Sequence, residues 1–180
     1  FLGAQAVPVR MNYLDSTDGA GLDLAGLEAA FKLGVRTFLF SNPNNPAGVV
    51  YSPAEIAGIA DLANRYGVTV IVDQLYARML FRGQVYTHLR ASSLNPTQVV
   101  TIIGPSKTES LSGYRLGAAF GAAHLIDRME KLQAIVSLRA PGYSQAVLRT
   151  WFSEDPRWLR DRIAKHEAIR DDLVRVLETA

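Results

Sequence analysis

Apolar residues along this chain fall into short continuous runs that alternate with stretches of helical spacing. The runs at 35–40, 68–72 and 99–103 are rich in β-branched or aromatic residues, as is typical of buried strands. Between them, apolar side chains recur at the three- and four-residue intervals of amphipathic helices. Strands that alternate with helices predict an α/β fold, in which a three-layer, mostly parallel sheet carries helices on both faces.

Capping residues predict where the first two helices begin and end. The helix that carries Leu24 to Phe31 should stop at Gly34, which is a common residue after a helix. The segment Ser52-Pro53-Ala54-Glu55 supplies an N-cap, a proline at the first helical position and the acid of a capping box. A second helix therefore begins there and should end at Gly67.

The remaining patterns are weaker but continue the same alternation. Small residues at 116–120 predict a strand, and the apolar spacing at 125–136 predicts a helix. A short helical stretch should follow at 144–152, and Asp155-Pro156 should cap a long final helix. The loose alternation at 7–14 is compatible with an edge strand.

Composition narrows the classes of partner and site. The net charge is +2 and basic residues are interleaved with acids, which argues against nucleic acid or an anionic membrane as a partner. The chain has no cysteine, so it forms no disulfide or thiolate metal site, and we expect a cytoplasmic protein. His88, His124 and His166 lack metal-ligand spacing, so no metal site is predicted.

Three predicted strands end next to residues that can do chemistry. Asn45, Asp73 and Lys107 each follow a strand, and open α/β sheets bind ligands at the carboxyl ends of their strands. A desolvated lysine amine there can form a Schiff base with a carbonyl. Each residue also has a plain structural interpretation: a solvated lysine, a turn-forming asparagine, or an aspartate that caps a helix or turn.

Three longer motifs surround these residues: Asn-Pro-Asn-Asn-Pro-Ala-Gly at 42–48, Asp-Gln-Leu-Tyr at 73–76, and Ser106-Lys107 with Arg115 eight residues after the lysine. Taken together, they resemble the class I/II aminotransferases, which are pyridoxal-phosphate enzymes of the aspartate-aminotransferase-like fold. The resemblance covers essentially the whole chain. It implies transfer of an amino group between an amino acid and a 2-oxo acid, with pyridoxal 5′-phosphate as cofactor.

The resemblance also implies a role for each residue. Lys107 would form the Schiff base with the cofactor and shuttle a proton, and Asp73 would accept a hydrogen bond from the pyridine N–H. Tyr76 and Asn45 would donate to the ring's phenolate oxygen. Arg115 would bind the phosphate as a planar fork of donors. The predicted catalytic residues are thus Lys107, Asp73 and Tyr76.

Two positions near Lys107 depart from the pattern or stay open. Gly104 occupies the place where many relatives have a phosphate-binding serine, and Ser106 is a candidate to compensate as a phosphate donor.

Arg139 lies where some relatives reach into the partner subunit, but we interpret it as a surface arginine. The resemblance further implies a cis bond between Asn45 and Pro46.

The resemblance suggests an incomplete large domain. Residues 1–153 would form part of the large cofactor-binding domain, and residues 154–180 would form a helix leading toward a missing small domain. A homodimer is expected for the full-length protein. Two alternatives remain open: a lyase or decarboxylase on the same scaffold, and a truncated core without turnover.

Overall fold

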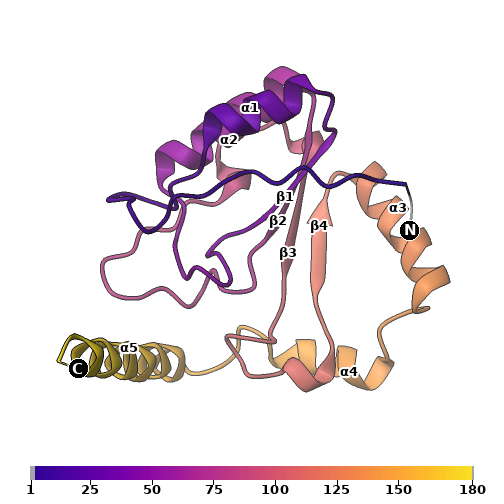
Figure 1. The fold of residues 1–180 in the computed structure, drawn as a ribbon. Coiled ribbons are helices and arrows are strands. Elements are labelled where there is room, and N and C mark those ends of the chain that lie inside the picture. Colours follow the sequence, from indigo (N-terminus) through magenta and orange to yellow (C-terminus); the bar gives the residue numbers. More distant parts are fainter. Residues whose placement is uncertain (1–2, 180) are drawn as a thin grey trace.

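A single four-stranded sheet organises the computed structural model, which describes residues 3–179 (Figure 1). Its strands lie in the order β1 (Thr37–Ser41), β2 (Thr69–Asp73), β3 (Val99–Ile103) and β4 (Ala118–Gly121). The first three strands are parallel, and β4 runs antiparallel to β3. The predicted mostly parallel α/β sheet is therefore confirmed.

Helices α1 (Leu24–Lys32) and α2 (Pro53–Tyr66) lie together on one side of the sheet (Figure 1). Their apolar stripes bury against alternate residues of β1 and β2, because successive strand side chains point to opposite faces. This contact forms the core of the described chain, and its members include Leu27, Phe31, Phe40, Ile56, Ile59, Val70 and Val72.

The predicted capping box at the start of α2 is present and has a further use. Ser52 caps the helix and exchanges hydrogen bonds with Glu55 in both directions. The buried carboxylate of Glu55 also accepts from the backbone N–H groups of Ala20 at 2.9 Å and Leu22 at 2.8 Å. One carboxylate thus fixes the N-terminal loop to the start of α2. The helix ends at Gly67 in the left-handed conformation, as expected.

The second half of the chain is built from helices of very different length. Helix α3 (Ala123–Val136) follows β4, and the stretch predicted as one short helix divides into α4 (Gly142–Ala146) and the 3₁₀ turn η4 (Val147–Thr150). The long final helix is α5 (Pro156–Glu178), capped by Asp155. Further 3₁₀ turns are η1 (Leu89–Ala91), η2 (Pro96–Gln98) and η3 (Ser112–Tyr114).

No helix within residues 3–179 combines the length and apolarity needed to cross a bilayer.

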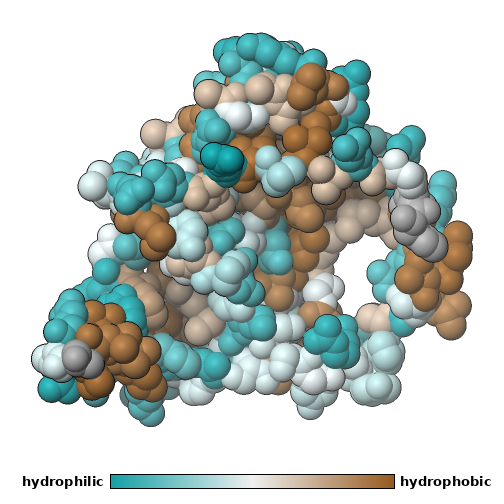
Figure 2. All heavy atoms as spheres, viewed as in Figure 1, coloured by the Kyte–Doolittle hydropathy of each residue, from teal (hydrophilic) through white to brown (hydrophobic). Residues whose placement is uncertain are grey.

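Helices α3 and α5 keep apolar faces exposed. Figure 1 shows α3 across the strands from α1 and α2, standing away from the sheet. In α3, Ile135 and Val136 are 82% and 81% exposed, and in α5 Ile169 is 65% exposed. Figure 2 shows a brown, apolar patch on each of these two helices, at opposite sides of the molecule, with teal, hydrophilic residues beside the patch on α5. The final residue, Ala180, to which we extended the helical pattern of α5, lies outside the described residues.

The interpretation of residues 7–14 as an edge strand is wrong. This segment is extended, but the bridge that it forms within the described chain joins Met11 to Leu22. The Asn12 N–H donates to the Gly21 carbonyl at 2.7 Å, so the segment pairs with its own returning loop instead of β1. Glu55 holds that returning loop in place, which explains why the alternation did not produce a sheet strand.

The Glu55 carboxylate should make stability depend on pH. Burial works to raise its pKa, but hydrogen bonds from Leu22, Ala20 and Ser52 outweigh burial and hold the pKa below the ordinary 4.5. Because the folded-state pKa is depressed, the stabilisation is present above pH 4.5 and is lost as the pH falls through the folded pKa. We expect Glu55→Gln to cost about 2–4 kcal/mol at pH 7.

Urea unfolding of the wild type and the variant between pH 7 and pH 3 measures both effects. The stability gap between the two proteins should narrow as the pH falls below 4.5. Glu178→Gln, at an exposed position near the end of α5, is the matched control and should leave stability nearly unchanged. A gap that stays constant over this range would contradict the assigned role of Glu55.

Candidate active site

The carboxyl ends of β1, β2 and β3 meet at one edge of the sheet. Ser41 is in register with Asp73, and Asp73 is in register with Ile102. The ladder continues one step past the strands: Asn42 N–H donates to the Asp73 carbonyl at 2.9 Å, and Gln74 N–H donates to the Ile102 carbonyl at 2.8 Å. The three loops that carry the predicted site residues therefore leave the sheet side by side.

Asp73 is half-buried at the end of β2 and shapes the turn that follows. Its Oδ1 accepts from the Leu75 N–H at 3.0 Å. Tyr86, which the sequence did not reveal, lies close by and donates its hydroxyl to the Asn42 carbonyl at 2.8 Å. Burial, together with the charge of Asp73, raises the pKa of Tyr86 and keeps its hydroxyl a donor. Tyr86 thus joins the segment after β2 to the loop at 42–48 after β1, which we call the asparagine loop.

The asparagine loop confirms the expected cis bond between Asn45 and Pro46. A second cis bond, between Asn42 and Pro43, was not predicted. The hydroxyl of Ser41 accepts from the Asn45 backbone N–H at 3.3 Å, which fixes the loop to the end of β1. The Asn45 side chain is exposed at this edge.

Lys107 faces Tyr76 across the edge. Its Nζ lies 5.7 Å from the centroid of the Tyr76 ring, within cation–π range. Among residues 3–179, no carboxylate lies within ion-pair distance of this ammonium. Tyr76 is held by a tight turn in which the Met79 N–H donates to its carbonyl at 2.8 Å. The edge therefore brings Lys107 and Tyr76 together, while the carboxylate of Asp73 bonds to its own turn.

The two predicted phosphate donors lie near the same edge, but within residues 3–179 their side chains form no hydrogen bond with the other predicted site residues. Arg115 precedes β4, whose antiparallel direction puts its beginning beside the end of β3. Its side chain is exposed and donates to the Ser112 carbonyl at 2.8 Å, and its backbone has a positive φ of 53°. Ser106 is half-buried directly before Lys107. Their binding of phosphate stays a prediction.

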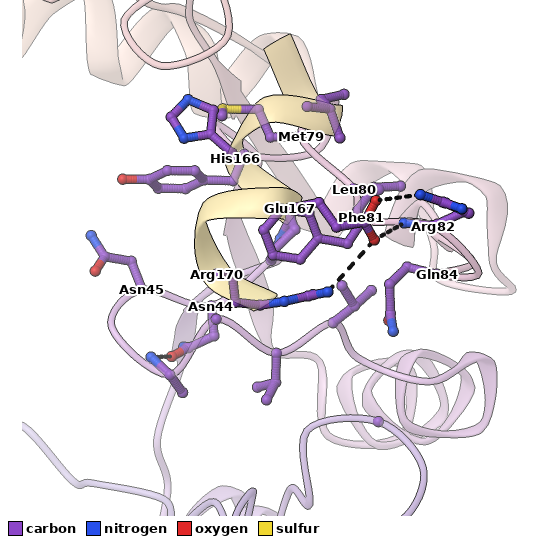
Figure 3. Close-up of a pocket in the computed structure, with 18 of the residues that line it drawn as sticks. Asn44, Asn45, Met79, Leu80, Phe81, Arg82, Gln84, His166, Glu167 and Arg170 are labelled. Carbon is purple, nitrogen blue, oxygen red and sulfur yellow. Dashed lines mark hydrogen bonds and ion pairs between the residues drawn. The ribbon is translucent and has the colours of Figure 1, made fainter. Parts of the chain in front are cut away.

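A cavity of about 790 Å³ opens beside this edge (Figure 3). Asn45 and Tyr76 line it, whereas the remaining predicted site residues lie outside its wall. Helix α5 closes the opposite side through buried Glu167, which accepts from the Arg82 N–H at 3.0 Å and forms ion pairs with Arg82 and Arg170. Within the described chain, no three His, Asp or Glu side chains cluster closely enough to hold a metal ion.

The fold and this edge define an α/β protein of the aspartate-aminotransferase-like class. An aspartate aminotransferase structure from Rhodobacter sphaeroides 2.4.1 superposes with a TM-score of 0.94 at 66% identity, covering 97% of this chain and 45% of that one. N-succinyldiaminopimelate aminotransferase from Mycobacterium tuberculosis superposes with a TM-score of 0.84 at 27% identity, covering 96% of this chain and 44% of that one.

The whole chain also matches one protein family. The profile described as "Aminotransferase class I and II" matches residues 1–180, so the chain belongs to this family. A similar curated relative is kynurenine–oxoglutarate transaminase 3 of Homo sapiens, 28% identical over 99% of this chain and 41% of its own length. The chain therefore spans less than half the length of the curated relatives and solved structures that it matches.

Two substitutions of Asp73 distinguish its structural role, as acceptor of the turn hydrogen bond, from the role of its charge. Asp73→Ala removes the acceptor for the Leu75 N–H and should cost about 1–2 kcal/mol of unfolding free energy. Asp73→Asn keeps an oxygen in that place and should cost less than about 0.5 kcal/mol. Urea unfolding measures both, with Asp127→Ala on the exposed side of α3 as control. Equal losses for the two Asp73 variants would show that the charge, not the turn, stabilises the fold.

Proposed function

We propose that this chain is the cofactor-binding part of a pyridoxal-phosphate-dependent aminotransferase, which moves an amino group between an amino acid and a 2-oxo acid. The observation that carries the proposal is the convergence of Asn45, Asp73, Tyr76 and Lys107 at one sheet edge of a chain that belongs to this family. The names of the relatives support the reaction, since they include aspartate and kynurenine–oxoglutarate aminotransferases.

The side chains at this edge fit the chemical groups of pyridoxal phosphate. Lys107 offers a primary amine without a carboxylate partner among the described residues, which suits an aldehyde. The half-buried carboxylate of Asp73 uses one oxygen for its turn and has capacity left for a ring N–H. The Asn45 amide and the Tyr76 hydroxyl are donors suited to a phenolate, and Arg115 and Ser106 are donors suited to a phosphate.

Each residue at this edge has its own role in the proposed reaction. Bound pyridoxal phosphate supplies an electron sink for the pair of electrons left when a substrate loses its Cα proton. Lys107 would hold the cofactor through its Nζ, and its free amine would carry the proton to and from the substrate Cα. Asp73 would accept a charge-assisted hydrogen bond from the ring N–H, and Asn45 and Tyr76 would donate to the ring oxygen. Arg115 and Ser106 would bind the phosphate.

The larger organisation follows from the same proposal. Residues 1–153 would belong to the large cofactor-binding domain, and the segment 154–180, which contains α5 (Pro156–Glu178), would lead toward a small domain. The full-length protein is a homodimer in the cytoplasm. The exposed apolar side of α3, which includes Leu132, Ile135 and Val136, supports a further protein contact, and the lack of cysteine fits a reducing compartment.

The reactive lysine can be identified directly, since the chain has only four lysines. Pyridoxal phosphate added to the protein and fixed with borohydride should label Lys107, because this amine lies at the strand edge beside Tyr76. Absorbance titration followed by peptide mapping measures the label. Lys107→Ala should lose it, and Lys131→Ala, on the exposed side of α3, should keep it.

Label that maps to Lys32, Lys131 or Lys165 in the wild type would overturn the assignment of Lys107. The reaction is tested on the full-length protein by adding amino acids one at a time and analysing the products. A 2-oxo acid formed with retention of the amino group on the cofactor supports transamination. Release of ammonia or carbon dioxide would instead place the protein among the lyases or decarboxylases.

Asp73→Asn should weaken cofactor binding without weakening the fold. A neutral amide cannot form the charge-assisted hydrogen bond to the ring nitrogen, so half-saturation with pyridoxal phosphate should rise roughly ten- to a hundredfold. Absorbance titration of the wild type and the variant measures the change. Unaltered half-saturation in a variant of normal stability would remove Asp73 from the cofactor site.

A further inference from the structure

An ion-pair cluster joins the two loops on either side of Lys107 and Tyr76. The guanidinium of Arg78 contacts the carboxylate of Glu109 through Nη1 and the carboxylate of Glu154 through Nη2. The side chains of Glu109 and Glu154 are only 8% and 17% exposed. Two nearly buried carboxylates from distant parts of the chain therefore depend on one arginine, because a buried charge is costly without a partner.

The surroundings of Arg78 hold it in one place. The ring of Phe152 covers the guanidinium, with 4.8 Å between Cζ and the ring centroid. A planar guanidinium can stack on a ring while its fork binds two carboxylates, which a lysine cannot do. The hydroxyl of Thr108 also donates to the Glu109 carboxylate. The pKa of Glu154 is held below its ordinary value, chiefly by the hydrogen bond from Arg78.

The residues of the ion-pair cluster follow those of the predicted site at the same interval on both segments. Tyr76 and Arg78 lie two residues apart on the turn after β2, and Lys107 and Glu109 lie two residues apart on the loop after β3. Tyr76 faces Lys107, and Arg78 pairs with Glu109, so the same two segments are joined at two successive points. Of the two, the ion pair is the stronger contact, because it combines full charges with hydrogen bonds in a mostly buried place.

We propose that Arg78 and Glu109 are positioning residues that hold the Lys107 loop against the turn that carries Tyr76. This proposal rests on the proposed function, in which Lys107 is the reactive lysine. The ion pair between Arg78 and Glu154 has a different role, because it fixes the start of α5, which begins at Pro156, to the same arginine. Removal of Glu109 and removal of Glu154 should therefore affect different segments of the chain.

Backbone amide hydrogen exchange in the cofactor-free protein tests the proposal. In residues 105–115, the N–H groups of Glu109 and Leu111 both donate to the Pro105 carbonyl, at 3.3 Å and 3.2 Å, and report whether this loop is formed. Arg78→Met and Glu109→Gln should each speed exchange in this segment roughly ten- to a hundredfold. Exchange in β3 should stay as in the wild type, since its ladder does not involve the cluster.

Glu154→Gln is the matched control. It removes the other carboxylate of the same arginine, so it should leave exchange in 105–115 unchanged and speed exchange only at the start of α5. Arg78→Lys should fall between the wild type and Arg78→Met, because it keeps the charge but not the fork. If Arg78→Met does not fold, the isosteric Glu109→Gln decides the question alone.

A second measurement follows the lysine itself. Half-saturation of borohydride-fixed pyridoxal phosphate on Lys107 should rise about tenfold or more in Arg78→Met and Glu109→Gln, but not in Glu154→Gln. Unchanged exchange in 105–115, or equal acceleration in all three variants, would overturn the proposal. If the wild type takes no label on Lys107, the proposed function fails, but the exchange experiment still decides whether the cluster orders the loop.

Discussion

The hydrogen-bond ladder around the end of β2 is the constraint on which the rest of this structure depends. Val70 and Val72 must face the helix layer, because together with α1 and α2 they form the core. Strand side chains alternate, so Asp73 must point to the opposite face, and a slip of one residue would bury its carboxylate in that core. The backbone of the same strand fixes where the loops on both sides begin. Burial of Val70 and Val72 on one face of the sheet thus determines that the carboxylate of Asp73 points to the other face.

Local signals explain why much of this arrangement could be predicted from the sequence. Short β-branched runs identify buried strands, and the box from Ser52 to Glu55 identifies the start of a helix, because each depends on neighbours within a few residues. Parallel strands then place their carboxyl ends together, which groups Asn45, Asp73 and Lys107 by topology alone. The prediction of the cis bond before Pro46 rested on the family resemblance, since no local sequence pattern specifies this bond.

Features that depend on contacts between distant residues could not be predicted. Tyr86 lies in a segment without periodicity, and its role is visible only once its hydroxyl meets the carbonyl of Asn42. The pairing of Arg78 with Glu109 and Glu154 spans 31 and 76 residues and leaves no spacing to recognise. The alternation at 7–14 misled for a related reason, because the buried carboxylate that redirects this segment lies in α2.

The cluster around Arg78 also explains how a carboxylate can lie two residues from Lys107 without pairing with it. A carboxylate placed directly on the ammonium would hold the amine in an ion pair and compete with a carbonyl carbon for it. Arg78 engages Glu109 instead, and the ring of Tyr76 is the partner that the structure gives to the Lys107 ammonium. A ring face attracts a cation more weakly than a carboxylate does, so it orients the amine but releases it readily. Sequestering the charge of Glu109 and positioning Lys107 are therefore two results of the same ion pair.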